Sequence, residues 1–401
     1  METKLKHLVF VSREFRPSLN AGGIASYVKE AAESLVQNGV KVSVICASDD
    51  TRTACEYIEN GVNVIRLSGG DFYVPQVEKN PFFIKRLRFA YRFFSYRLKI
   101  RHIIQDLEEV SVIEVAEYAA EGLFLLNLNI PLVVRLHTPY LLDRKTEDVR
   151  QFSFQNVHYY WVGLLEIFIM KKAKHVTSCS ESLKRWMNEK KGISSHNITT
   201  IYNPLNVINW SPSPKKNSSK QPFTLFFSGR IQSEKGVEEL IYAVKSIRAK
   251  GINIFLYLAG REGKISSDLR KEIEKENWDW CVFLGHLTRE QLKEYYTKST
   301  ISCFPSWWEN MPYTCLEAMA LGAIIITSSN GGMLEVIIDG ENGFLCPPLN
   351  VEALAQKIES VLSMENQKRE KIAQNAIATI KNNFSTILIA KKNIDYYNAL
   401  F

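Results

Sequence analysis

The residues best placed to do chemistry are two glutamates, Glu309 and Glu317, which stand eight positions apart. Pro312 and Gly322 mark the start and end of a helix predicted over residues 313–321, so one glutamate precedes the helix and the other lies in its first turns. Amides at a helix N-terminus carry partial positive charge and favour a phosphate or pyrophosphate. A carboxylate beside a phosphate would repel it, so we expect the glutamates to accept hydrogen bonds from sugar hydroxyl groups. This combination indicates a nucleotide-sugar site, the alternative being charges that only cap and solvate a helix.

Cations for a diphosphate must come from another segment, because no Lys or Arg lies between Ser299 and Gln356. Arg230 and Lys235 follow a strand predicted over residues 223–228 and are close enough in sequence to converge on one anion. The alternative is two solvated surface cations. The chain has no Asp-x-Asp motif. We therefore expect protein cations, and no metal ion or other cofactor, to hold the diphosphate.

A glycine pair, Gly22 and Gly23, lies between a strand predicted over residues 6–12 and a helix predicted over residues 25–38. Glycines at this position allow a ligand to approach the backbone and present free amides, although a plain turn is the default interpretation. The pattern is neither G-x-G-x-x-G nor a P-loop, so it does not indicate a dinucleotide or Mg-ATP site.

Two further polar positions follow predicted strands over residues 111–115 and 132–136, where ligands of parallel sheets bind. They are Glu117 and His137. A lone histidine in such a place is equally compatible with a structural role.

Composition and organisation bound the fold. With 401 residues, 46% of them hydrophobic and 23% charged, the chain has the profile of two or three globular domains. The seven cysteines form no C-x-x-C pair, which argues against a disulfide framework or zinc site and favours a reducing, cytosolic setting. No signal-peptide core and no transmembrane helix is predicted. Strands alternate with helices, which predicts an α/β fold with parallel sheets.

The ordered motifs of the second half carry a family resemblance. Pro305-Ser306, Glu309, Glu317-Ala-Met-Ala-x-Gly, Gly331-Gly332-x-x-Glu335 and Asp339-Gly340-x-x-Gly343 follow one another, preceded by Ser228-Gly229-Arg230 and Gly236. This string resembles the donor-binding half of the retaining family 4 glycosyltransferases of GT-B fold, known as glycosyl transferases group 1. The resemblance is strong over residues 223–348 and weak over residues 1–204.

The resemblance implies two Rossmann-like domains whose parallel sheets face an interdomain cleft, with a C-terminal helix that crosses back. We predict an acceptor-binding domain over residues 1–205 and a linker over residues 206–222, which is rich in Pro, Ser and Lys. The nucleotide-sugar domain then covers residues 223–383 and the crossing helix residues 384–401.

The resemblance also implies roles for individual residues. The expected catalytic residues are Glu309, Arg230, Lys235 and His137. The expected donor-binding residues are Gly22, Gly23, Arg230, Lys235, His286, Glu309, Met311, Pro312, Tyr313, Thr314 and Glu317. Candidates on the acceptor side are Glu14, Glu117 and Asn203.

The function that the resemblance implies is retaining, metal-independent transfer of a hexosyl-type sugar from a UDP- or GDP-sugar to a glycan or lipid-linked acceptor, in cell-surface polysaccharide or glycolipid synthesis. One alternative is a nucleotide-sugar epimerase on the same fold. The other is a non-catalytic membrane-associated binding protein.

The last distinctive segment is basic and aromatic. Residues 82–102 hold seven Lys or Arg, seven Phe or Tyr and no acid, and an apolar stripe at helical spacing includes Phe83, Leu87, Phe94 and Leu98. Such a helix suits an anionic membrane surface, or it packs its stripe on the domain core. No nucleic acid is expected as a partner, because no known binding module surrounds the segment. The membrane interpretation predicts a cytoplasmic protein, peripheral on the inner face of the membrane.

Overall fold

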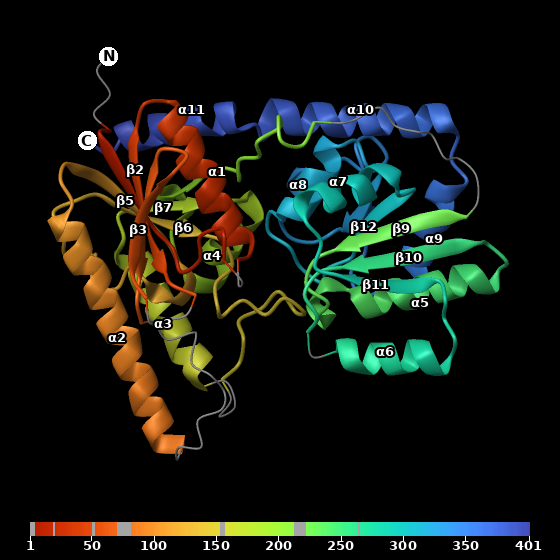
Figure 1. Ribbon diagram of the computed structural model, residues 1–401, viewed down its shortest axis with the longest axis horizontal. Helices are drawn as coiled ribbons and strands as arrows, with labels where there is room; N and C mark the ends of the chain where they lie inside the picture. Colours follow the sequence, from red (N-terminus) through yellow and green to blue (C-terminus); the bar gives the residue numbers. More distant parts are fainter. Residues whose placement is uncertain are drawn as a thin grey trace. The chain divides into compact units, whose positions relative to one another are not determined.

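The computed structural model describes residues 5–18, 21–49, 53–69, 82–152, 157–211, 222–263 and 265–401. The chain forms two compact units, shown in Figure 1. Unit 1 comprises Met1–Leu142, Val149–Pro204 and Thr386–Phe401. Unit 2 comprises Asp143–Asp148 and Leu205–Ser385.

Unit 1 is built on an eight-stranded sheet in the order β3-β4-β2-β1-β5-β6-β7-β8. Its strands are β1 (His7–Val11), β2 (Lys41–Ala47), β3 (Cys55–Glu59), β4 (Val62–Leu67), β5 (Val110–Ala116), β6 (Leu132–Leu136), β7 (His175–Ser178) and β8 (Ile198–Thr200). Every pair is parallel except β3 with β4. The central strands are apolar on both faces because helices cover both faces of a parallel sheet.

The helices of unit 1 are α1 (Gly23–Gln37), α2 (Phe82–Asp106), α3 (Val157–Lys172), α4 (Glu181–Lys191) and α11 (Thr386–Asn398), with short 3-10 turns η1 (Tyr118–Ala120) and η2 (Ser195–Asn197). One buried carboxyl group ties two of these helices to the sheet. Glu114 of β5 accepts hydrogen bonds from Tyr27 of α1 at 2.6 Å and from Tyr397 of α11 at 2.5 Å. The C-terminal helix is thereby part of the core of unit 1.

Unit 2 is built on a six-stranded parallel sheet in the order β11-β10-β9-β12-β13-β14. Its strands are β9 (Phe223–Ser228), β10 (Ile254–Ala259), β11 (Cys281–Gly285), β12 (Ile301–Phe304), β13 (Ile325–Ser328) and β14 (Phe344–Cys346). Its helices are α5 (Val237–Ala249), α6 (Ser266–Lys275), α7 (Arg289–Lys298), α8 (Tyr313–Ala320), α9 (Val351–Leu362) and α10 (Asn366–Asn383), with 3-10 turns η3 (Ser233–Lys235) and η4 (Gly332–Glu335).

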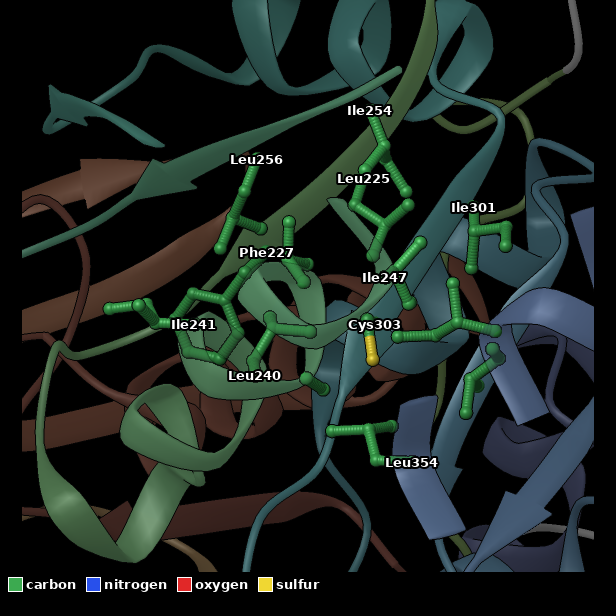
Figure 2. Close-up of a cluster of buried hydrophobic side chains, with 14 of the residues drawn as sticks. Leu225, Phe227, Leu240, Ile241, Ile247, Ile254, Leu256, Ile301, Cys303 and Leu354 are labelled. Atoms are coloured by element: carbon green, nitrogen blue, oxygen red, sulfur yellow. The ribbon is translucent and has the colours of Figure 1, made fainter. Parts of the chain in front are cut away.

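The core of unit 2 lies on both faces of this sheet. Figure 2 shows Leu225 and Phe227 of β9 packed with Leu240 of α5 and Leu354 of α9 on one face. Phe226 points to the other face, where its ring stacks on Tyr295 of α7 with centroids 5.0 Å apart. The alternation along β9 therefore anchors helices on both sides, and the loops at the strand ends are left to carry polar residues.

The α/β fold with two parallel sheets predicted from the sequence is confirmed. The helix predicted over residues 313–321 is α8, and the strand predicted over residues 223–228 is β9. Trp210 falls in the predicted linker, yet it is buried in unit 2 against Tyr296, with ring centroids 6.3 Å apart. Residues 212–221 of that linker lie outside the described residues.

All seven cysteines are free thiols, and only Cys55 is exposed. Over the ranges given above, no helix combines the length and the apolar character needed to cross a membrane.

Candidate active site

Several of the donor-binding residues expected in unit 2 lie at one point of the sheet. β9 pairs with β10 on one side and with β12 on the other, so the strand order reverses between β9 and β12. At such a switch point the following loops leave toward opposite faces, and ligands of open parallel sheets bind there. The loop after β9 carries Arg230 and Lys235, and the loop after β12 carries Glu309. The structure brings Lys235 and Glu309 together although 74 residues separate them.

The centre of this site is an ion pair. The ammonium group of Lys235 donates to Oε1 of Glu309, and Ser306 Oγ donates to the same oxygen at 3.0 Å. The side chains of Lys235 and Glu309 are 17% and 14% exposed. Water therefore screens the pair only in part, and each charge is stabilised mainly by the opposite charge of its partner.

Two glycines allow the loops to approach so closely. Gly236, which follows Lys235, has φ +68°, and a Cβ atom there would lie 2.0 Å from the Pro305 carbonyl oxygen. Gly331 has φ +67°, and its Cβ would lie 2.0 Å from the Glu309 carbonyl oxygen. The next amide, Gly332 N–H, donates to that carbonyl at 2.9 Å. Any side chain at either glycine would push the loops apart, which is why the glycines of the family-like motif stand there.

Trp307 fixes the loop after β12 from the other side. Its indole N–H donates to Glu239 of α5 at 2.9 Å, and its backbone N–H donates to the Glu234 carbonyl at 3.1 Å. Asn330 donates to the Trp307 carbonyl at 2.9 Å. The carboxylate of Glu309 thus lies on a loop that hydrogen bonds fix to the neighbouring segments of unit 2.

The electrostatic balance keeps Glu309 ionised. Burial by itself would raise the pKa of Glu309, but the charges of Lys235 and Arg144, with the hydrogen bonds from Lys235 and Ser306, outweigh burial and lower this pKa below its usual value. Burial lowers the pKa of Lys235, and the attraction of Glu309 offsets part of that effect. Arg144 belongs to the short stretch Asp143–Asp148 of unit 2. Its positive charge therefore acts on both members of the pair from a distant part of the sequence.

The N-terminus of α8 adjoins the same loop. Pro312 is its N-cap residue, and the helix begins at Tyr313. Met311 and Tyr313 are buried, whereas Pro312 and Thr314 are partly exposed. Glu317 is half-buried on α8, and its charge, after burial itself, contributes to a pKa of Tyr296 well above the usual value. The helix thus starts directly after the Glu309 loop, with Glu317 one turn further on.

Arg230 and His286 occupy more peripheral positions in unit 2. Arg230 is exposed at the end of β9, and its charge is one of those that lower the pKa of Lys235. His286 is exposed after β11, two strands away from β9 in the sheet. The structure gives His286 no contact with the Lys235–Glu309 pair among the interactions of the described residues.

In unit 1 the strand order reverses between β1 and β5, and the loops after these strands carry Glu14, Gly22 and Glu117. The carboxyl group of Glu14 accepts the Gly22 amide at 2.7 Å. The prediction that Gly22 presents a free amide is therefore wrong, because a carboxyl group of the same loop already occupies it. Gly23 is exposed at the start of α1.

Glu117 and His137 come together at the ends of β5 and β6. Oε1 of Glu117 accepts the amides of His137 at 2.8 Å and Thr138 at 2.5 Å. Burial raises the pKa of Glu117 to about 7, although these amide donors oppose the shift. Burial, assisted by the charge of Arg135, lowers the pKa of His137 well below its usual value. His137 is therefore a neutral imidazole at physiological pH, packed on the ring of Tyr27 with centroids 5.1 Å apart.

The side chain of Asn203 is bound to a neighbouring residue of unit 1. Its side-chain oxygen accepts a hydrogen bond from the buried guanidinium of Arg135 at 3.2 Å. Arg135 also donates to the Ile201 carbonyl at 2.7 Å and lies over the Tyr27 ring at 4.0 Å. The amide group of Asn203 thus stabilises the cation that lies two residues before His137 in the chain.

Three contributors were not predicted from the sequence. Ser306 belongs to the Pro305-Ser306 motif, but the motif alone does not indicate that Ser306 donates to Glu309. Arg144 carries no local signal, since it reaches the site only through the fold. Glu166 is the sole acid of α3 and lies within its apolar middle, which could have marked it; it accepts the amides of Ala119 at 2.7 Å and Tyr140 at 2.9 Å.

No three His, Cys, Asp or Glu side chains of the described residues are grouped so that they could hold a metal ion.

Two family models match the chain. Residues 210–379 match the one described as Glycosyl transferases group 1, and residues 21–207 match the one described as Glycosyltransferase Family 4. The chain is 28% identical to a Methanocaldococcus jannaschii protein described as an uncharacterized glycosyltransferase, over 97% of both chains. It is 25% identical to glycogen synthase of Mycobacterium tuberculosis, over 93% of this chain and 90% of that one.

Solved structures show the same fold. Sucrose-phosphate synthase from Thermosynechococcus elongatus superimposes with a TM-score of 0.78 at 22% identity, covering 99% of each chain. HepE of Anabaena in complex with UDP-glucose gives a TM-score of 0.72 at 18% identity, covering 98% of this chain and all of that one.

The raised pKa of Glu117 predicts a pH-dependent stability. The native state holds its proton up to about pH 7, whereas an unfolded glutamate releases it near the ordinary value of 4.5. Between these values ionisation favours the unfolded state, so native stability falls as pH rises, by about 3 kcal/mol in total. Glu117→Gln cannot ionise and should gain that amount relative to the native sequence from pH 4.5 to 7, as measured by urea denaturation followed by circular dichroism.

Glu189→Gln is the matched control, because Glu189 is exposed on α4 of the same unit. Its stability should equal that of the native sequence at every pH. The buried neighbour Glu166 stays in all three proteins, but the charge of Glu117 adds to the effect of burial in raising the pKa of Glu166, so the gain of Glu117→Gln includes the loss of this repulsion. A stability difference between Glu117→Gln and the native sequence that does not change with pH would contradict the assignment.

Proposed function

Because this chain belongs to glycosyltransferase family 4, we propose that it transfers a sugar from a nucleoside diphosphate sugar to a hydroxyl group of a glycan or lipid-linked acceptor. We propose retention of anomeric configuration and no requirement for a metal ion. The observation that carries the proposal is the pair of Lys235 and Glu309, held at the switch point between β9 and β12 beside the start of α8.

In this proposal the donor binds to unit 2, with its diphosphate at cations and its hydroxyl groups at carboxylates. Lys235 and Arg230, with the first amides of α8, take the diphosphate. Glu317 accepts the ribose hydroxyls, and Glu309 accepts hydroxyls of the sugar. Met311, Pro312 and Thr314 border the diphosphate, and His286 lies on the nucleobase side. Arg144 adds positive charge next to the pair, in keeping with its effect on both pKa values.

The chemical step requires the bond between the anomeric carbon and the leaving phosphate oxygen to break. Negative charge then builds on the nucleoside diphosphate, and preorganised cations and dipoles stabilise it more than they stabilise the intact donor. The acceptor oxygen bonds to the anomeric carbon, and its proton passes to the leaving phosphate oxygen. Glu309 orients the sugar and is fixed as a carboxylate by its two donors, Lys235 and Ser306.

Unit 1 is the proposed acceptor side. The neutral His137 would donate to, or accept from, a sugar hydroxyl without adding charge. Glu117 would act through it, because this buried carboxyl group holds the His137 and Thr138 amides. Gly23 would contact the substrate, Glu14 would position the glycine loop, and Asn203 would position Arg135.

Relatives support the substrate classes. HepE of Anabaena was solved with UDP and with UDP-glucose, and starch synthase IV of Arabidopsis thaliana with ADP and acarbose. The chain is 24% identical to the capsular polysaccharide biosynthesis glycosyltransferase CapM of Staphylococcus aureus, over 76% of this chain and 86% of that one. We therefore propose a UDP-sugar as donor, with the GDP-sugar expected from the sequence as the alternative, and polysaccharide or glycolipid synthesis, at the cytoplasmic membrane face, as the setting.

The donor site predicts a defined nucleotide-binding behaviour. Calorimetric titration with UDP, GDP and ADP should show that one nucleotide binds and that EDTA leaves its affinity unchanged. Lys235→Ala should weaken that binding about 10–100-fold, since it removes a charged donor to the diphosphate.

Lys250→Ala is the matched control, because Lys250 follows α5 at the opposite edge of the same sheet, where it pairs with Glu359 at 2.6 Å. It should bind the nucleotide as the native sequence does. Failure of all three nucleotides to bind, or binding that EDTA abolishes, would contradict the proposed site.

Substitutions of the two glutamates should affect different measurements, nucleotide affinity for Glu317 and the rate of sugar transfer for Glu309. Glu317→Gln should weaken binding of the nucleotide itself about 10-fold, because the ribose loses a charged acceptor. Glu309→Gln should not weaken nucleotide binding, because it removes a negative charge near the diphosphate, yet it should slow sugar transfer about 10²-fold. Nucleotide titration and transfer to an added acceptor measure the two effects.

An equal loss of nucleotide affinity in both variants would contradict these roles. Release of free nucleotide only when an acceptor is added distinguishes transfer from the rival epimerase activity, which needs no acceptor.

A further inference from the structure

Among the side chains of α2 that the structure describes, the buried ones lie on one face. Phe93, Tyr96, Ile100 and Ile104 are buried at successive turns of this face. Arg97 is buried among them, where its guanidinium donates to the carbonyls of Phe93, Ala119 and Ala120. This face accounts for the attachment of the helix to the domain.

A second apolar stripe of α2 is largely exposed. Leu87, Tyr91, Phe94 and Leu98 follow one another at spacings of four, three and four residues, so they share one side of the helix. Their exposed fractions are 55%, 75%, 40% and 42%. The stripe of residues 87, 94 and 98 is therefore not buried in the domain core, as the alternative expected, although the Phe94 ring also contacts Phe124, with centroids 6.3 Å apart. The side chains of residues 82–86, which include Phe83, lie outside the described residues.

Helix α3 extends this surface. Trp161 of α3 contacts Phe94 of α2, with ring centroids 6.4 Å apart. Leu164 and Phe168 lie three and seven residues after Trp161, on the same side of α3, and are 50% and 46% exposed. Figure 1 shows the two helices next to each other in unit 1. We call this the α2–α3 surface, and its members are Leu87, Tyr91, Phe94, Leu98, Trp161, Leu164 and Phe168.

The exposed charges that α2 carries between residues 87 and 105, and α3 at residues 171 and 172, are positive. The sequence from residue 82 to residue 105 has no acid, and Arg88, Arg92 and Lys99 lie on α2 outside its buried face. Lys171 and Lys172 are exposed at the end of α3. The only acid of α3, Glu166, is fully buried. Exposed apolar side chains with a border of cations match the interface of an anionic bilayer, in which acyl chains lie beneath negative head groups.

We propose that the α2–α3 surface docks unit 1 on an anionic lipid membrane, with the apolar stripe entering the head-group boundary and the cations contacting lipid phosphates. A second copy of the chain fits the surface poorly, because it would place two positively charged faces together. The docking rests on the membrane setting of the proposed function and names the surface responsible, but it needs neither nucleotide nor transfer activity and can be tested apart from them. It would bring the enzyme to acceptors that carry a lipid.

The test is sedimentation of the full chain with vesicles of phosphatidylcholine, alone or with about one-third phosphatidylglycerol. A stripe variant replaces exposed apolar residues by serine, at Leu87, Tyr91 and Leu98. Its matched control replaces three exposed isoleucines elsewhere by serine, at Ile58, Ile208 and Ile387, which are 77%, 80% and 76% exposed.

A charge variant combines Lys99→Glu with Lys172→Glu. Its control reverses two exposed lysines of unit 2, with Lys271→Glu and Lys298→Glu. Nucleotide titration on every variant reports whether unit 2 is folded, and circular dichroism reports on the whole chain.

We expect the native chain and both controls to bind the anionic vesicles and not the neutral ones. The stripe and charge variants should bind the anionic vesicles at least tenfold more weakly. Absence of binding by the native chain, equal binding to neutral vesicles, or equal losses in variants and controls would overturn the proposal. So would unchanged vesicle binding in a stripe variant that has lost self-association in analytical ultracentrifugation, since the surface would then bind a second copy.

Discussion

The candidate site depends on one partly desolvated ion pair, Lys235 with Glu309. A buried pair is costly to form, and either charge left alone would be costlier still, so the surrounding structure must hold both side chains in place. It does so with Ser306 as a second donor and with glycines where the loops touch. The pair is thus a preorganised arrangement of charges. A diphosphate can compete for the cation while a sugar hydroxyl approaches the carboxylate.

The two sheets use their switch points in different ways. In unit 2 the switch point between β9 and β12 brings opposite charges together. In unit 1 the loops that follow β5 and β6 are held by carboxyl groups with raised pKa values, Glu117 and Glu166, which accept backbone amides. Buried acceptors of this kind fix loop backbones without leaving amides unsatisfied. Burial and the charge of Arg135 lower the pKa of His137 and keep it neutral, which suits a group that contacts hydroxyls rather than phosphates.

The donor half could be predicted from the sequence because its residues lie in compact motifs that begin directly at strand ends. Glu309, α8 and Lys235 are examples, and the fold follows from the alternation of apolar strands and helices. Contributions that depend on distant packing could not be predicted. Arg144 reaches unit 2 from a six-residue stretch within the first half of the chain, and Gly22 gives its amide to Glu14. The periodicity of α2 revealed an apolar stripe but not that a different face, with Phe93 and Ile100, packs on the core.

The central claim is that Lys235 and the start of α8 hold a donor diphosphate beside Glu309. A crystal structure of the chain with the nucleotide that binds in titration tests it most directly. The account predicts phosphate density within hydrogen-bonding distance of the Lys235 ammonium group and the first amides of α8, with the ribose hydroxyls at Glu317. Nucleotide density at another edge of the sheet, or phosphates without contact to Lys235, would contradict it.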